Sequence, residues 1–85
     1  DNLGAMKYKF DNDRITPVGV KGGERLQNIA SLLRMDYSIL KKINLHLKKD
    51  FVPHNSNIMV NIPTLRLHMF RTLYRNYRRE AYYRR

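Results

Sequence analysis

The stretch GGERLQNIASLLRMDYSILKKIN, residues 22–44, decides the fold because it predicts two short amphipathic helices in succession. The first helix begins at about Glu24, where the apolar residues take up helical spacing. They keep the i, i+3, i+4, i+7 spacing of a single stripe: Leu26, Ile29, Ala30 and Leu33. We expect this stripe to face the core.

The second helix is predicted to begin after Asp36. An aspartate side chain at this position accepts hydrogen bonds from the free amides of the first helical turn. Leu40 and Ile43 form the inner face of this helix, and Met35 is placed to pack back on it. The helix ends near Asn44, a residue type that suits a turn.

A short strand is predicted before the helix pair. Val18 and Val20 alternate with a glycine and a lysine, as in a strand that buries one side. Pro17 confines this strand to a sheet edge or to its own first residues, because proline has no N–H to donate. Gly22 and Gly23 end the strand.

A second strand is predicted after the loop of residues 45–57. Its inward residues are Ile58, Val60 and Ile62. Met59 and Asn61 point outward, and Pro63 ends the strand. The order strand, helix, helix, strand allows the two strands to pair antiparallel with both helices on one face. The fold class is therefore predicted as α+β, with a two-stranded antiparallel sheet.

The rest of the chain, residues 64–85, predicts a third amphipathic helix with Thr64 as its cap. The apolar arc consists of Leu67, Phe70, Leu73, Tyr74, Tyr77 and Ala81. The opposite arc, a candidate contact for a polyanion or a partner, consists of Arg71, Arg75, Arg78 and Arg79. We expect docking on the rest of the molecule through Leu67, Phe70 and Tyr74, because such a stripe is usually buried.

Charge is uneven along the chain. The 85 residues carry a formal net charge of +10. Residues 1–63 hold 10 basic and 6 acidic residues (+4), whereas residues 64–85 hold 7 basic and 1 acidic (+6). Such a field attracts nucleic acid, anionic wall polymer or a membrane surface alike. The chain has no cysteine, which excludes disulfides and thiolate metal sites.

Three segments are predicted. Residues 1–14 are expected to be a cloning remnant followed by a loose lead-in, because they mix Gly, Ala and Met without an apolar period. Residues 15–63 form the strand–helix–helix–strand domain, and residues 64–85 form the basic helix. We expect a monomer.

Several spaced residues carry a resemblance to a known family. They are Val20, Gly23, Glu24, Arg25, Leu26, Ile29, Ala30, Met35, Leu40, Ile43, Asn44, Pro53, Ile62 and Pro63. Over residues 18–63 this set resembles the LysM domain, whose usual pattern is V-x-x-G-[DE]-[TS]-L-x-x-I-A, an L-x-x-x-N helix end, I-x-P-G and a terminal I-P. The segment NLHLKKDFVP, residues 44–53, is similar to LysM modules of membrane-bound lytic murein transglycosylases of the D type.

The resemblance implies a βααβ fold that binds N-acetylglucosamine-containing glycan, either peptidoglycan or chitin, in the periplasm or cell envelope of a bacterium. It also implies a parent transglycosylase whose catalytic domain is absent from this chain. The family's shallow groove lies between the loop after the first strand and the loop before the second. Carried over by position, its residues are Gly23, Glu24, Arg25, Leu26, Phe51, Val52, Pro53 and His54.

Three features of these loops depart from the family pattern. Arg25 stands where a small hydroxyl residue is usual, and His54 stands where a glycine is usual. Extra residues around Ser56 lengthen the second loop. Longer side chains and a loss of backbone freedom are expected to narrow the groove.

The acids and histidines do not predict an enzyme or a cofactor. Glu24, Asp36 and Asp50 fall at a loop, a cap and a turn, so no rigid cleft presents the carboxylate pair of a glycosidase. The three histidines lack the i, i+4 spacing of a helical zinc site and are expected at the surface: His46, His54 and His68.

A helix-turn-helix that binds nucleic acid is the alternative. The two helices have its spacing, and the basic charge provides for phosphate contacts. The second helix would present Tyr37, Ser38, Lys41 and Lys42 to the bases. It begins with Asp36, however, and an acid at that end repels phosphate.

Overall fold

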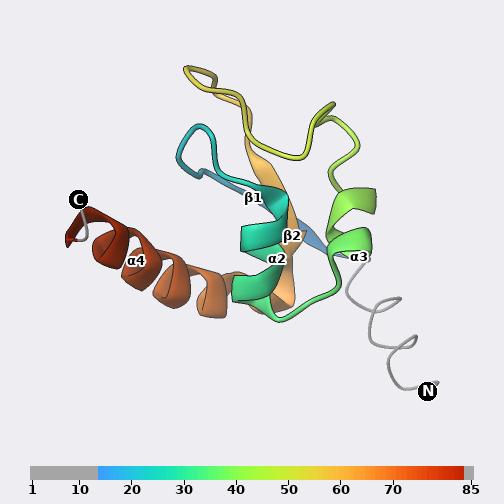
Figure 1. Ribbon diagram of the computed structural model, residues 1–85. Coiled ribbons are helices and arrows are strands. Elements are labelled where there is room, and N and C mark those ends of the chain that lie inside the picture. Colours follow the sequence, from blue (N-terminus) through green and yellow to red (C-terminus); the bar gives the residue numbers. More distant parts are fainter. Residues whose placement is uncertain (1–13, 84–85) are drawn as a thin grey trace.

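The computed structural model describes residues 14–83 and has the predicted order of strands and helices (Figure 1). The elements are β1 (Ile15–Val18), α2 (Leu26–Leu33), α3 (Tyr37–Lys42), β2 (Val60–Pro63), a 3₁₀ turn η1 (Thr64–Arg66) and α4 (Leu67–Tyr83). The prediction of a remnant and lead-in falls almost wholly on residues 1–13, outside the described residues. The α+β class and the two-stranded antiparallel sheet are confirmed.

The two strands pair in the expected direction, but β1 lies earlier in the chain than predicted. Val18 is the last residue of β1 and faces Val60, while Ile15 faces Pro63. Val20 lies beyond the strand and is partly buried against the core. Pro17 is tolerated inside β1 because each strand of a two-stranded sheet has an open edge that needs no N–H.

β2 also begins later than predicted. Val60 and Ile62 are fully buried as expected, whereas Ile58 is 39% exposed, so its placement as an inward strand residue was wrong. Residues 57–59 precede the ladder and are not held in a strand pleat. Only the part of the segment opposite β1 takes up the alternation, because pairing supplies the backbone partners that fix it.

Helix α2 provides the centre of the core. All four residues of its predicted stripe are buried: Leu26, Ile29, Ala30 and Leu33. Burying each large aliphatic side chain contributes about 1.5–3 kcal/mol. The helix begins at Leu26 instead of Glu24, because the Glu24 carbonyl accepts from the Val52 amide and so belongs to a loop contact.

Helix α3 is held at both ends. The Asp36 side chain caps it as predicted by accepting from the Ser38 amide at 3.2 Å. At the other end Asn44 is fully buried, and its Nδ2 donates to the carbonyls of Leu40 and Asn61 at 2.8 Å each. The Asn61 amide donates back to Asn44 Oδ1 at 2.7 Å, so one side chain joins the end of α3 to β2.

Helix α4 docks on the domain through its first turns. Phe70 is 5% exposed, and Leu67 and Tyr74 pack against the core, as predicted. Thr64 does not cap a helix; its hydroxyl pairs with that of Thr16 at 2.7 Å, and it opens the 3₁₀ turn. Arg66 donates to the carbonyl of Leu33, the last residue of α2, which ties the turn before α4 to that helix. From there α4 runs beneath the loop after β1 (Figure 1).

Candidate functional site

The two loops predicted to form the groove lie side by side and are hydrogen-bonded to each other. The Gly23 amide donates to the Val52 carbonyl at 2.6 Å, and the Val52 amide donates to the Glu24 carbonyl at 2.8 Å. The Leu26 amide donates to the Asp50 carbonyl at 2.9 Å, and Arg25 bridges Phe51 in antiparallel fashion. Residues 22–26 and 50–54, the paired loops, thus form one short backbone ladder.

This ladder divides the eight predicted site residues into two groups. Leu26 and Val52 are at most 1% exposed and Glu24 is 8% exposed, so these three side chains point into the molecule. The other five are partly or fully exposed: Gly23, Arg25, Phe51, Pro53 and His54. The apolar floor expected from Leu26 and Val52 is therefore part of the core, since side chains alternate along paired backbone.

The glycines of the first loop allow the second loop to approach closely. A Cβ added to Gly22 would lie 2.9 Å from the His54 Cα, and one added to Gly23 would lie 2.6 Å from the His54 imidazole. Gly23 also has a φ of +91°, which side-chain-bearing residues rarely adopt. The imidazole of His54, one of the departures from the family pattern, thus lies against Gly23.

Two pockets open beside the paired loops. The first, the loop pocket, has a volume of about 370 Å³ and is lined by His46, Leu47, Lys48, Lys49, Phe51, Pro53 and Ile58. The second, the α4 pocket, has a volume of about 330 Å³ and is lined by Lys21, Gly22, Gly23, Glu24, His54, Tyr77, Arg78 and Ala81. One pocket is mainly apolar and the other is mainly polar, so they suit different parts of a ligand.

Helix α4 fixes the first loop through the buried carboxylate of Glu24. Tyr74 donates its hydroxyl to Glu24 Oε2 at 2.9 Å, and Tyr77 donates to Oε1 at 3.1 Å. The Tyr74 hydroxyl in turn accepts from the Lys21 amide at 2.9 Å. Burial raises the pKa of Tyr74 to about 12 and also raises the pKa of Tyr77. Both hydroxyls therefore keep their protons and remain donors at neutral pH.

These tyrosines are the functional residues that sequence reasoning missed. They were assigned to the apolar arc of the third helix, and Tyr74 does pack on the core, with its ring 5.0 Å from that of Phe70. Nothing local pairs them with Glu24, which is 50 residues away from Tyr74. The neighbours of Glu24 in the sequence are Gly23 and Arg25, so no local pattern signals that its charge is buried and requires donors.

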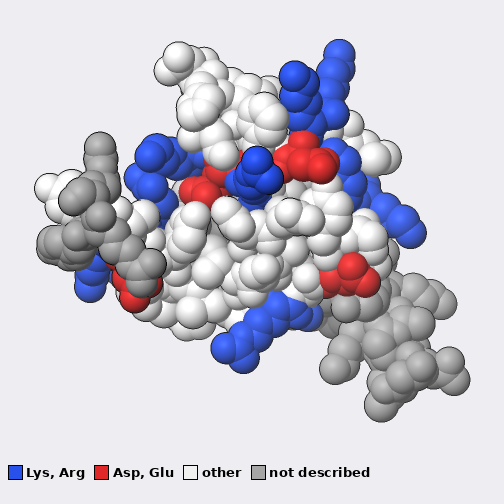
Figure 2. All heavy atoms as spheres, in the orientation of Figure 1, with Lys and Arg blue, Asp and Glu red and all other residues white. Residues whose placement is uncertain are grey.

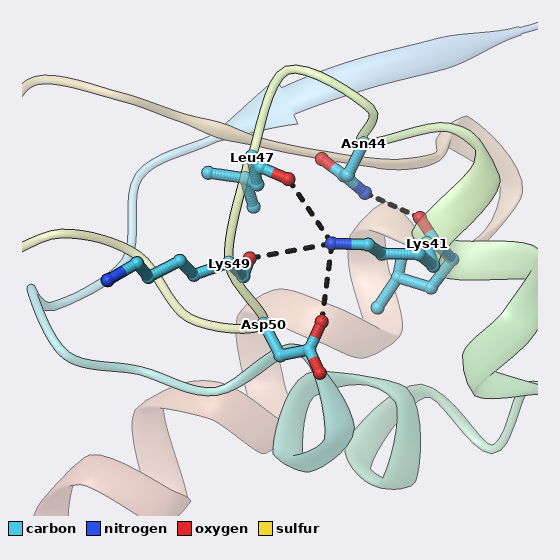
Figure 3. Close-up of polar contacts among 6 residues, drawn as sticks. Lys41, Asn44, Leu47, Lys49 and Asp50 are labelled. Carbon is cyan, nitrogen blue, oxygen red and sulfur yellow. Dashed lines mark hydrogen bonds and ion pairs between the residues drawn. The ribbon is translucent and has the colours of Figure 1, made fainter.

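Lys41 fixes the second loop from α3 (Figure 3). Its Nζ donates to the carbonyls of Leu47 at 3.2 Å and Lys49 at 3.5 Å, and pairs with Asp50 Oδ1 at 3.3 Å. Hydrogen bonds from Tyr37 and then from Lys41 hold the pKa of Asp50 below its usual range. The lysine that the alternative reading assigns to base contacts is therefore committed to the loop.

The basic residues are spread over the surface and are not clustered in one patch. Arg71, Arg75 and Arg79 are exposed on α4, whereas Arg78 is half-buried and lines the α4 pocket. On the face drawn in Figure 2, Lys and Arg side chains stand in several separate places, with acidic groups among them. Of the four arginines predicted to contact a polyanion, only Arg78 joins the pocket beside the paired loops.

The acidic side chains have structural partners, and the histidines lie at the surface. Glu24 accepts from two tyrosines, Asp36 caps α3 and Asp50 pairs with Lys41. His46, His54 and His68 are exposed, as predicted. Within residues 14–83 no three His, Asp or Glu side chains are grouped so that they could hold a metal ion. Over the same residues, no helix combines the length and apolar character needed to cross a bilayer.

Comparison with known proteins identifies no relative of this chain. Neither the known protein families, nor the curated proteins, nor the solved structures contain a match to the chain. The features of the molecule that indicate a function are therefore the paired loops, the two pockets beside them and the contacts that hold the loops in place.

Proposed function

We propose that this chain is a non-catalytic carbohydrate-binding module that recognises N-acetylglucosamine-containing glycan, with peptidoglycan as its ligand and chitin-type oligosaccharide as a related one. The observation that carries the proposal is the ladder between residues 22–26 and 50–54, with a pocket on either side. These segments are separated by two helices in the sequence but present one surface.

The chemistry of the ligand fits the two kinds of surface. An acetylated sugar offers hydroxyl and amide groups along its edges together with an apolar methyl group. Sites for such ligands combine a few polar groups with an apolar wall. Phe51 and Pro53 are partly exposed and line the mainly apolar loop pocket, which suits the methyl group. The mainly polar α4 pocket, lined by Lys21, His54 and Arg78, suits the hydroxyl and amide groups.

A site this small implies weak binding by one module. We expect a dissociation constant of roughly tens of micromolar to millimolar, with avidity from neighbouring modules or from repeated sites in a cell wall. Such a module would tether a cell-wall-processing protein, for example a lytic transglycosylase, to its polymer in the periplasm or cell envelope. Chemistry would belong to another part of that protein.

The contacts of α3 favour the glycan over nucleic acid. The N-terminal end of α3 is occupied by the Asp36 carboxylate, which would repel DNA phosphates. The ammonium of Lys41 contacts the second loop, and Asn44 fastens the other end of the helix to β2. Ser38 and Lys42 are the exposed residues of this six-residue helix, so little remains to read a groove.

One titration tests both functions. Isotope-labelled protein is titrated with N-acetylglucosamine oligomers and, separately, with duplex DNA at two salt concentrations. We expect the oligomers to shift amide signals of the paired loops, with little dependence on salt because the sugar is neutral. DNA binding through phosphates would weaken steeply with salt. No shift at millimolar sugar, or salt-sensitive DNA shifts centred on α3, would overturn the glycan proposal.

A further inference from the structure

Helix α4 closes one side of the α4 pocket and brings a cation to the edge of the paired loops. Tyr77, Arg78 and Ala81 come from α4, whereas Gly22, Gly23 and His54 come from the loops. Arg66 and the two tyrosine contacts with Glu24 hold the helix in this position. The pocket therefore exists only because the domain and the C-terminal helix meet there.

We propose that the α4 pocket binds a carboxylate group attached to the glycan, with Arg78 as its principal contact. This inference rests on the proposed glycan binding and narrows the ligand to an acidic glycan. Peptidoglycan carries carboxylates on its stem peptides, and on its lactyl groups where no stem peptide is attached, whereas chitin carries none. The pocket would thus distinguish the two polymers, which the neutral sugar contacts alone would not do.

The charges around the pocket support an anionic group. The Glu24 carboxylate is 8% exposed and accepts from two tyrosine hydroxyls, so its oxygens already have donors. Lys21 and Arg78 line the same pocket. Across residues 14–83 the one ion pair is Lys41 with Asp50, so neither Lys21 nor Arg78 has a carboxylate partner. A half-buried guanidinium can donate two parallel hydrogen bonds to a carboxylate.

The buried charge of Glu24 favours a carboxylate over a phosphate. Glu24 lines the pocket and repels any anion that enters. Lys21 and Arg78 together outweigh Glu24 by one positive charge, which a single carboxylate neutralises and a doubly charged phosphate exceeds. The attraction of the pocket for an anion grows in proportion to the anion's charge, whereas the cost of removing the anion from water grows with the square of that charge. We expect free phosphate to be a poor competitor.

Matched ligands and variants test this inference on the whole chain. The acidic ligand is a peptide-free tetrasaccharide of alternating N-acetylglucosamine and N-acetylmuramic acid, whose lactyl carboxylates are free. Its matched control is the same tetrasaccharide with these carboxylates converted to carboxamides. We expect the acidic form to bind about tenfold more tightly in low salt, a factor in the range of one charge-assisted hydrogen-bonded contact.

Arg78→Ala should remove this preference, so that the acidic and carboxamide forms bind with the same affinity. Arg79→Ala is the matched control, because it makes the same charge change one residue further on and lies outside the pocket lining. Arg79→Ala should keep at least half of the ratio between the two affinities. Circular dichroism of both variants checks that α4 is intact, as expected for Arg→Ala in a helix.

The outcomes separate this inference from the proposed function. Equal affinity of the two tetrasaccharides for the unmodified chain, or equal losses in Arg78→Ala and Arg79→Ala, would overturn the carboxylate site and leave glycan binding intact. Displacement of the acidic ligand by equimolar inorganic phosphate would also overturn it, by indicating a general anion site. If neither tetrasaccharide nor an N-acetylglucosamine oligomer binds, both proposals fail.

Discussion

The two loops at the site are held by different kinds of contact. The first loop is fixed by a distant helix through a buried carboxylate and two tyrosine hydroxyls. Residues 47–50, which lead into the second loop, are fixed by a nearby helix through Lys41, whose ion pair with Asp50 joins side chains that are 29% and 68% exposed. Polar contacts are worth more when both partners are shielded from water. The first loop should therefore be the rigid wall of the site, and residues 47–50 the adaptable one.

The largest effect should come from the base of the second loop, where Asn44 is fully buried. Asn44→Ala would leave the carbonyl of Leu40 and the amide and carbonyl of Asn61 without their partner. We expect the free energy of unfolding to fall by about 3 kcal/mol, measured by urea denaturation. Asn57→Ala, at an exposed position of the same loop, should change it by no more than about 0.5 kcal/mol. Similar losses of unfolding free energy in the two variants would show that Asn44 does not anchor the base of this loop.

The anchor of the first loop should show the next largest effect. Tyr74→Phe keeps the ring on the core but removes a donor to Glu24 and the acceptor of the Lys21 amide. We expect a loss of about 2 kcal/mol in the free energy of unfolding, within the range of about 1.5–3 kcal/mol for a hydrogen bond to a charged group. Tyr77→Phe should cost less, because Tyr77 makes one longer contact with Glu24. A larger loss of unfolding free energy in Tyr77→Phe than in Tyr74→Phe would show that Tyr77, and not Tyr74, is the main anchor of Glu24.

Alkaline pH should loosen the same anchor in the unmodified protein. The pKa of Tyr74 is raised from 10.0 to about 12 in the folded chain. Above pH 10 the unfolded chain has lost this proton while the folded chain retains it, so stability falls as the pH rises from 10 to 12. We expect a loss of about 1 kcal/mol, since partial exposure and screening reduce the full linkage value. Thermal melts at several pH values measure it, and Tyr74→Phe should flatten the decline.

The smallest effect should come from residues 47–50, at the entry to the second loop. Asp50→Asn removes the ion pair with Lys41, which is exposed and therefore weak. We expect an unchanged unfolding midpoint together with faster hydrogen exchange of loop amides near Lys49. Because the pKa of Asp50 is lowered, its contribution is present above the usual aspartate pKa and is lost as the pH falls through the folded value. A clear drop in midpoint at neutral pH would show that the two loops are held equally firmly.

Most elements of the fold could be predicted from particular residues, and so could the two loops of the candidate site. The stripe from Leu26 to Leu33 and the Asp36 cap are local patterns, and the structure bears them out. The proximity of Gly23 to Val52 was expected only through the resemblance. The limits of β1 and β2 were misplaced, because a strand extends only as far as its partner does. Leu26 and Val52, two of the residues expected at the groove, are buried in the core.

The amino-acid sequence by itself determined the three helices, the antiparallel pair of strands and the docking face of α4, because apolar spacing and caps act within a few residues. Only the tertiary structure decided that Tyr74 and Tyr77 hold Glu24, that Lys41 holds the second loop, and that Arg78 lines a pocket beside the first. These contacts depend on where long side chains from separate elements meet. A buried or pocket-lining polar group takes whichever partner the packing brings within hydrogen-bonding distance, and no local pattern specifies that partner.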